Sequence, residues 1–445
     1  MGRAVACMVG ITRGFPETKG CDCMKLFMLF LLLPATFFTN CLFAQTDPVF
    51  QKEKISDKLY RFSASKIVSP PSIMAFVGDD GVLLIDTGRK NTAEALKKEI
   101  LALGKGDPKI IIITHGGHNE HFEGNIAFEK EPLIIAHSIA KKQMESGVNL
   151  FQEYPSYMLP DLTIDKSEIS LFFNGEEIKI IPLPGGHDES DIVVWFTKSK
   201  IVCVGGLSSG NLFPYVSPSC SVLVFMEQQK KLIAMLPDDV TIHNGHGEKL
   251  SKSEYTHYYT EMHDFDSIIF EDVKAGKTND EIKADPRLQR FASYSNQYTQ
   301  MNDHIDRIIA EHKNASSNKP VVTQKDIYQP LYQAYKTEGV KSLVQQYKML
   351  KKDTSVTYEE REAGLFNIAY LFRQSGKIAD SAAVAETFIE EFPKSQYLFY
   401  AYFWMGKNEQ QNGNTKKALK LMKKALDLSP NHPTILATIK ELESK

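Results

Sequence analysis

The amino-acid sequence predicts an α/β domain followed by an all-α domain. Short apolar runs separated by turns fill residues 49–247, with helical patterns between some of them. From residue 249 onward, the apolar residues recur mainly at helical spacing. Further on, Gly339, Gly376 and Gly413 recur at intervals of 37 residues, which is typical of a helical repeat.

The first part mixes predicted strands with helices, which favours a layered α/β domain. The Asp-Asp-Gly sequence at residues 79–81 separates two apolar runs and predicts a β-hairpin. Residues 91–104 have apolar side chains at helical spacing and end at a glycine, so we expect a helix there. The expected strands lie in segments 58–64, 73–88, 109–115, 133–137, 178–186, 191–197 and 200–206.

The all-α part divides into a helical extension and a repeat. Pro393 and Pro430 each follow a repeating glycine by 17 residues, so each unit reads as helix, turn, helix and stop. This order resembles the tetratricopeptide repeat; a plain helical bundle that happens to be periodic is the alternative. The expected boundaries are 45–248 for the α/β domain, 249–312 for the helical extension, 313–324 for a polar linker and 325–445 for the repeats.

Residues 1–44 have the composition of an export signal. Lys25 precedes a nearly continuous apolar run that starts at Leu26, and Ala44 is the small residue before the expected cleavage site. We therefore expect an upstream extension, a signal peptide at 24–44, and a periplasmic or secreted protein. A membrane anchor is the alternative, but the run is interrupted and short for a span. After cleavage we expect no membrane association.

Charge and cysteine content argue against two classes of protein. The net charge is −3 and no basic block stands out, so we expect no nucleic-acid partner. Four of the six cysteines lie in residues 1–44, which leaves Cys203 and Cys220. Two cysteines are too few for a disulfide framework, and Cys203 lies in an apolar strand where we expect a small buried residue.

One loop concentrates residue types that bind metals. His115, His118 and His121 lie within seven residues at the end of the apolar run 110–113, together with Glu120. The ends of buried strands are where the sites of α/β proteins collect. Three histidines and a carboxylate in one loop fit a nitrogen-rich site for a divalent metal.

Two further histidines occur in similar settings. His187 ends a Gly-Gly-His sequence after a predicted strand, and His246 stands between two glycines after an apolar stretch. Glycine beside a histidine lets the backbone approach another group closely. The other histidines lack this setting and are interpreted as structural or surface residues, namely His137, His243, His257, His263, His304, His312 and His432.

Five stretches, in order, resemble the metallo-β-lactamase superfamily over residues 51–247. They are DDGVLLIDTG, THGGHNEHFEGN, GGHDESDIVVWF, KIVCVGG and NGHGE. The resemblance implies an αββα sandwich with metals at one edge, between the two sheets. It also implies hydrolysis of a small-molecule substrate by metal-activated water, with one or two zinc ions as the cofactor.

Carried over residue by residue, the resemblance implies six metal ligands in two groups. The first group is His115, His118 and His187, and the second is Glu120, His121 and His246. Glu120 is also the implied catalytic residue, because it would hold the second metal and orient the attacking water. Asp86 is implied to brace the metal loop by hydrogen bonds rather than to bind metal.

The sequence departs from the family pattern at three points. The loop has an extra residue between His115 and His118, a glutamate replaces an aspartate at Glu120, and Gly206 stands where the family often has a bridging aspartate. In one interpretation the extra glycine and the longer carboxylate compensate, and the site holds two zincs, or one. In the other, the site is degenerate. Some relatives use a cysteine ligand near Cys220, but we expect this residue to be structural.

The sequence thus predicts an exported zinc-dependent hydrolase that cleaves an amide, lactam, ester or thioester. A catalytically degenerate domain that acts as a scaffold beside the repeats is the alternative. Stacked repeats form a concave surface suited to a protein or peptide partner. Segments 144–165 and 208–221 are expected to select the substrate, and they contain aromatic residues but no basic cluster. These aromatic residues are Phe151, Tyr154, Tyr157, Phe213 and Tyr215.

Overall fold

The computed structural model describes most of the chain after residue 49. The described residues are 50–64, 70–129, 132–147, 151–217, 219–296, 299–316, 327–352, 361–395, 397–430 and 432–444. The predicted signal peptide and its cysteines lie outside this range, as does most of the predicted linker. Within the described part, no helix combines the length and apolar character needed to cross a membrane.

The first sheet follows the order of the chain. Its described strands are β1 (Phe50–Lys54), β2 (Leu59–Ala64), β3 (Ile73–Gly78), β4 (Gly81–Ile85), β5 (Pro108–Ile112), β6 (Leu133–His137) and β7 (Leu162–Ile164). β1 to β4 pair antiparallel, and β4 to β7 pair parallel. The predicted hairpin is confirmed, since β3 and β4 pair up to Gly78 and Gly81 across the Asp79–Asp80 turn. Because β4, β5 and β6 are parallel, their carboxyl ends share one edge.

The second sheet has the order β13-β12-β11-β10-β9-β8. Its described strands are β8 (Ile169–Phe173), β9 (Glu176–Pro182), β10 (Ile192–Phe196), β11 (Ile201–Cys203), β12 (Thr241–His243) and β13 (Lys249–Ser251). β11 and β12 pair parallel, and the other neighbours pair antiparallel. Cys203 is buried in β11, as predicted, and both Cys203 and Cys220 are free thiols.

The helices of this part flank the sheets. They are α1 (Ala93–Leu101), α2 (Ser138–Ser146), α3 (Val222–Met235), α4 (Lys252–Lys274), α5 (Asn279–Lys283) and α6 (Met301–Ser316). Short 3₁₀ helices connect them: η1 (Lys90–Thr92), η2 (Asn119–His121), η3 (Glu123–Ala127), η5 (Ser156–Met158) and η6 (Pro286–Tyr294). A capping box formed by Ser251 and Glu254 starts α4.

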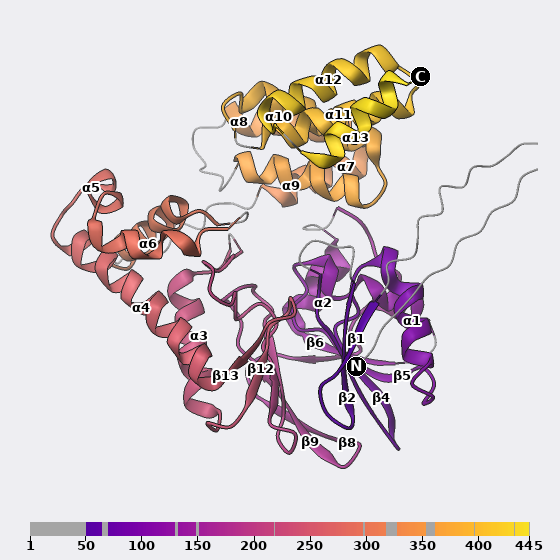
Figure 1. Ribbon diagram of the computed structural model, residues 1–445, viewed down its shortest axis with the longest axis vertical. Helices are drawn as coiled ribbons and strands as arrows, with labels where there is room; N and C mark the ends of the chain where they lie inside the picture. Colours follow the sequence, from indigo (N-terminus) through magenta and orange to yellow (C-terminus); the bar gives the residue numbers. More distant parts are fainter. Residues whose placement is uncertain are drawn as a thin grey trace, which may run out of the picture. The chain divides into compact units, whose positions relative to one another are not determined.

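Three hydrophobic cores give this part its layers. Alternate side chains of β5 face opposite ways: Ile110 and Ile112 pack between the sheets with Ile180, and Ile111 packs in the core that includes α1 and α2. A third core joins Val193 of the second sheet to side chains of α3, α4 and α6. The layers are therefore helix, sheet, sheet and helix, which confirms the predicted αββα sandwich (Figure 1).

Paired helices make up the C-terminal part, as predicted. They are α7 (Tyr328–Glu338), α8 (Val340–Lys352), α9 (Arg361–Gln374), α10 (Ile378–Glu391), α11 (Leu398–Gln411), α12 (Thr415–Leu428) and α13 (Pro433–Glu443). Each repeating glycine lies between the two helices of a pair, and Gly339, Gly376 and Gly413 have φ of 74°, 77° and 77°. This conformation favours glycine, which explains why the residue recurs in register.

Three details differ from the expected elements. The segment expected to be helical from residue 249 begins with strand β13, whose pairing with β12 overrides the local pattern. α6 continues to Ser316, so the first residues of the predicted linker are helical. α3 was not predicted, because its sequence VLVFMEQQKKLIAM has a run of apolar residues at its start rather than a clear helical stripe.

Candidate metal centre

The loop after β5 carries four of the six predicted ligands. It leaves the sheet at Thr114, next to the carboxyl end of β4, and forms η2 at Asn119–His121. His187 lies in the turn between β9 and β10, and His246 follows β12. The predicted ligands therefore come from both sheets.

The structure brings these six residues together in two groups. His115, His118 and His187 form one group; Glu120, His121 and His246 form the other. Within each group, one potential ligand atom per residue lies within 4.8 Å of the others. The two groups are adjacent, because the ring centroids of His115 and His121 are 3.9 Å apart.

The orientation of the histidine rings fits metal binding. His121 Nδ1 lies 2.8 Å from Asp86 Oδ2, and His187 Nδ1 lies 2.7 Å from the carbonyl oxygen of Tyr215. Ligating histidines usually donate their second ring N–H in this way, which leaves the other nitrogen as a ligand. Nε2 of His115 and of His121 are buried and have no hydrogen-bond partner among the described residues. Buried nitrogens of this kind fit ligands of a divalent ion.

The ionisation states of the site also suit metal ligands. Burial and the neighbouring histidines hold the pKa of His115 and His187 well below the ordinary value, so both rings are neutral at pH 7. Burial raises the pKa of Glu120, but Arg89 and the nearby histidines outweigh it and bring this pKa to about 2. For His121, the Asp86 carboxylate outweighs the burial and raises the pKa. The site thus presents the neutral imidazoles of His115 and His187 beside the ionised carboxylate of Glu120.

Asp86 braces the start of the metal loop. Its carboxylate accepts hydrogen bonds from the backbone N–H and the hydroxyl of Thr114, each at 2.8 Å, and also contacts His121. Asp86 has a φ of 58°, in the left-handed region that non-glycine residues rarely adopt. The position is strained, and the three polar contacts offset this cost. Asp86 is in neither ligand group.

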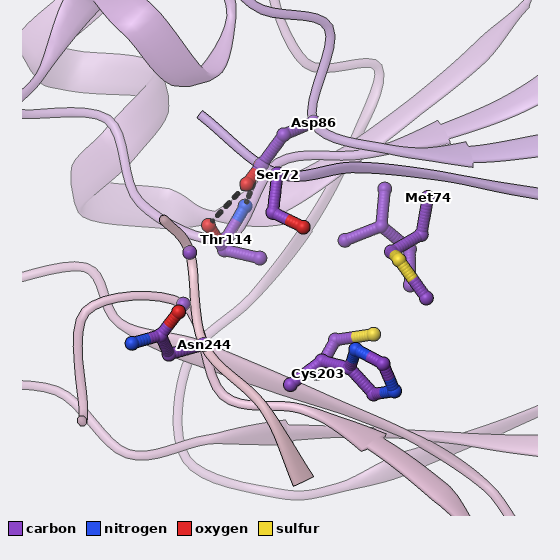
Figure 2. Close-up of a pocket in the computed structure, with 10 residues that line it drawn as sticks. Ser72, Met74, Asp86, Thr114, Cys203 and Asn244 are labelled. Atoms are coloured by element: carbon purple, nitrogen blue, oxygen red, sulfur yellow. Dashed lines mark hydrogen bonds between the residues drawn. The ribbon is translucent and has the colours of Figure 1, made fainter. Parts of the chain in front are cut away.

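A small cavity lies behind this brace (Figure 2). Its volume is about 10 Å³, and its lining includes Ser72, Asp86, Thr114, Cys203 and His243. Figure 2 shows the hydrogen bonds between Asp86 and Thr114 at one side of the cavity and Cys203 at the other. The hydroxyl of Ser72 and both ring nitrogens of His243 are buried without a hydrogen-bond partner in the described chain. The cavity has about the size that one water molecule requires.

The two glycines of the loop are both needed where they stand. A Cβ atom on Gly116 would lie 2.6 Å from the Cα of Ala140 in α2, and one on Gly117 would lie 2.1 Å from Oδ2 of Asp188. Both distances are far below van der Waals contact. At Gly116 the obstacle is the backbone of α2, so a larger residue there would push the loop outward; at Gly117 it is the end of the Asp188 side chain. The extra residue of this loop is thus packed against α2 and the β9–β10 turn, and His118 remains beside His187 with 3.2 Å between Nδ1 and Nε2.

Gly206 is also constrained by the site. A Cβ atom at this position would lie 2.0 Å from Cδ2 of His187. The imidazole of His187 occupies the space that a side chain at position 206 would need. A carboxylate cannot be added here while His187 keeps its position.

Several residues that position the site were not predicted from sequence. Arg89 lies 3.9 Å from Glu120, and Thr114 and Tyr215 contact the site histidines. Arg307 of α6 donates to the carbonyl oxygens of the loop that carries Tyr215. A backbone carbonyl carries no sequence signal, and an arginine far along the chain has no motif, so only the tertiary structure reveals these contacts.

The aromatic residues expected to select the substrate mostly lie elsewhere. Phe151 packs with Tyr332 and Phe372 in the core of the repeats. Tyr154 packs on Phe122, and Phe213 packs on Phe265 and His304. Phe151 and Phe213 are buried core residues, so the expectation is wrong for these two. Tyr154 is partly buried and packs against the core of the first sheet. Cys220 belongs to neither ligand group.

Comparison with known proteins agrees with this geometry. Residues 68–246 match the family model of the metallo-beta-lactamase superfamily. This part of the chain is a metallo-β-lactamase superfamily domain. Residues 363–395 and 399–432 match models of the tetratricopeptide repeat, so the C-terminal part contains tetratricopeptide repeats.

Solved structures similar to part of the chain include metallo-β-lactamases. One is a metallo-beta-lactamase from Pontibacter korlensis, with 19% sequence identity, coverage of 48% of this chain and 99% of that chain, and a TM-score of 0.43. Another is the DIM-1 metallo-beta-lactamase, with 17% identity, coverage of 48% and 98%, and a TM-score of 0.41. No curated protein matched the chain.

Proposed function

We propose that the chain is an exported zinc-dependent hydrolase whose metallo-β-lactamase domain cleaves an amide, lactam, ester or thioester. The observation that carries the proposal is the convergence of two ligand groups despite the altered loop. His115, His118 and His187 would hold one ion; Glu120, His121 and His246 would hold another. Donor sets rich in imidazole nitrogen suit zinc.

The residues around the metals have distinct tasks. Bound zinc supplies a water whose pKa is lowered to about 7 and a Lewis acid for the carbonyl of the substrate. Glu120 is ionised at neutral pH and is available as an anionic ligand and hydrogen-bond acceptor. Asp86 and the carbonyl of Tyr215 each hold one ring N–H, which keeps His121 and His187 turned toward the centre of the site.

Export and a macromolecular partner are further parts of the proposal. Export is supported by the apolar run that follows Lys25 and ends before Gln45. Tetratricopeptide repeats suggest a protein or peptide partner, because stacked helix pairs present extended surfaces for such ligands.

Zinc content tests the central claim. We expect residues 45–445, purified in the presence of zinc, to carry about two zinc ions per chain by elemental mass spectrometry. His118→Ala removes a ligand of the first group and His121→Ala a ligand of the second, so each variant should lose about one ion. His257→Ala, at an exposed position on α4, is the matched control and should keep both.

Activity is tested on the same preparations. A panel of lactams, esters and thioesters should contain a substrate whose hydrolysis is abolished by a chelator and restored by zinc. A chain that binds no zinc would contradict the proposal. That result would favour the alternative, a catalytically inactive domain that acts as a scaffold beside the repeats, because the two ligand groups would bind no metal.

A further inference from the structure

Tyr215 differs from the other aromatic residues of the two segments in its position. Its ring centroid lies 5.5 Å from that of His118 and 5.9 Å from that of His187. Both histidines belong to the first ligand group. The side chain is partly exposed, unlike the buried rings of Phe151 and Phe213. Tyr215 thus places a partly accessible ring beside the candidate metal position.

The backbone of Tyr215 is tied to the site. Its carbonyl oxygen accepts the hydrogen bond from His187 Nδ1 at 2.7 Å, and Ser217 N–H donates to the carbonyl oxygen of His187 at 2.9 Å. These two hydrogen bonds connect segment 208–221 to the β9–β10 turn. A displacement of Tyr215 would therefore also displace His187.

The loop is also held from the outside by α6. Arg307 donates to the carbonyl oxygens of Val216, Ser217 and Cys220 at 2.6, 2.8 and 2.7 Å. Glu311, one turn later, accepts hydrogen bonds from the Ser221 hydroxyl and from backbone N–H groups at the start of α3. With both sides fixed, the ring of Tyr215 is presented on a rigid support, which reduces the entropy that a ligand must overcome on binding.

We propose that Tyr215 is a specificity-determining residue that selects acyl compounds with a planar apolar group next to the scissile carbonyl. The inference rests on the proposed function, because it places the substrate carbonyl at the ligand groups. A carbonyl held beside His118 and His187 brings its neighbouring substituent against the Tyr215 ring. Aromatic rings stack on planar apolar groups more favourably than their buried area alone explains.

Two zinc-binding thiols that differ only in a phenyl ring test this assignment. The probes are 2-mercapto-3-phenylpropanoate and 2-mercaptopropanoate, whose binding to the zinc-loaded chain is measured by calorimetry. Both have the same thiol and the same carboxylate, so the ratio of their dissociation constants measures the contribution of the phenyl ring to binding. We expect the native chain to prefer the phenyl compound about tenfold, consistent with one ordered aromatic contact.

Two variants separate the ring of Tyr215 from its other contacts. Tyr215→Phe keeps the ring and should keep the preference, whereas Tyr215→Ala should reduce it to less than about twofold. The backbone carbonyl that holds His187 is present in both. An unchanged preference in Tyr215→Ala would overturn the assignment, and so would loss of zinc from that variant, since the residue would then be structural. A native chain without zinc would instead refute the proposed function itself.

Discussion

Gly116 and Gly117 allow the metal loop to pack closely against α2 and Asp188. The sequence has one residue more between His115 and His118 than the family pattern. In the structure the pair lies where α2 and Asp188 leave no room for a Cβ atom. The loop is thus longer than the family pattern, and Gly116 is buried against α2. Such packing, rather than the loop length, keeps His115 and His118 in one group.

Replacing one of these glycines should damage both stability and metal binding. Gly116→Ala forces a Cβ atom against the backbone of α2, which cannot move independently of its helix. We expect the free energy of unfolding to fall by about 1–3 kcal/mol, as in other overpacked sites, and zinc content to fall with it. Urea denaturation and elemental analysis measure the two effects.

A second glycine serves as the control for Gly116→Ala. Gly104 has a φ of 76° in the turn after α1, and nothing lies within 4 Å of a Cβ placed there. Gly104→Ala should cost about 1 kcal/mol of backbone strain but leave zinc content at the native level. Equal zinc loss in both variants would show that the contact with α2 is irrelevant to the site.

A change at Asp86 should weaken zinc binding by the second ligand group and leave zinc binding by the first unchanged. Asp86→Asn keeps the shape of the side chain but replaces one acceptor oxygen with a donor, so it cannot serve both Thr114 and His121. We expect the zinc affinity of the second group to fall about 10–100-fold, as for other residues that orient a metal ligand. Competition titration with a chromogenic chelator should show one weakened site and one native site. Two native sites would argue against the bracing role.

The helix α6 illustrates how an element remote in sequence determines the site. Arg307 has three hydrogen bonds to the loop that contacts His187. Arg307→Met removes these bonds and leaves carbonyl oxygens without their donor. We expect a loss of about 2–3 kcal/mol in unfolding free energy and weaker zinc binding at the first group. Arg290→Met is the control, because Arg290 forms exposed ion pairs with Glu261 and Asp264 and should cost less than about 1 kcal/mol.

The same helix should make the protein sensitive to acid through His304. Burial, with Arg307 nearby, lowers the pKa of His304 to about 3, against about 6.5 in the unfolded chain. Below pH 6.5 the unfolded chain takes up a proton that the folded chain does not. The stabilisation from a neutral His304 is therefore complete above about pH 6.5 and is lost as the pH falls toward 3.

Replacing His304 with a group that does not titrate should weaken this dependence. Between pH 7.5 and pH 5, the native chain should lose about 2 kcal/mol more unfolding free energy than His304→Gln. Urea denaturation at the two pH values gives the difference directly. Parallel losses in both chains would mean that His304 does not remain neutral in the folded state.

The elements themselves were predictable to different degrees. The long apolar strands and the glycine-marked repeats could be predicted, because the local sequence and the final structure agree there. The three-residue strands β12 and β13 have little pattern of their own and exist through pairing with their neighbours. At the site, sequence indicated the histidines through their flanking glycines. It gave no sign of the Tyr215 carbonyl or of Arg307, which act through tertiary contacts.

At the scale of the whole molecule, the site joins the two sheets. His115 and His121 follow a strand of the first sheet, whereas His187 and His246 follow strands of the second. Metal bound to residues of both sheets would stabilise the sandwich against separation. Free zinc at a thousandfold excess over its dissociation constant should add about 4 kcal/mol to the unfolding free energy.

The positions of the two tryptophans allow this effect to be assigned to the sandwich. Trp195 lies in β10 and Trp404 lies in α11 of the repeats, and the sequence contains no other. In Trp404→Phe, the fluorescence change on unfolding reports the second sheet alone. We expect zinc to shift this transition to higher urea and a chelator to reverse the shift. A transition insensitive to zinc would exclude a metal that links the sheets.

Gly206 restricts the order in which substitutions at the site can occur. Because the ring of His187 fills the space beside Gly206, an aspartate at 206 is compatible with the fold only after His187 has moved or been replaced. The two positions are therefore epistatic, and the order of substitutions matters. A site with a bridging carboxylate cannot be reached by changing residue 206 first, since the intermediate sequence would disrupt a ligand before the new one could serve. The present arrangement is separated from that alternative by a step that impairs the site.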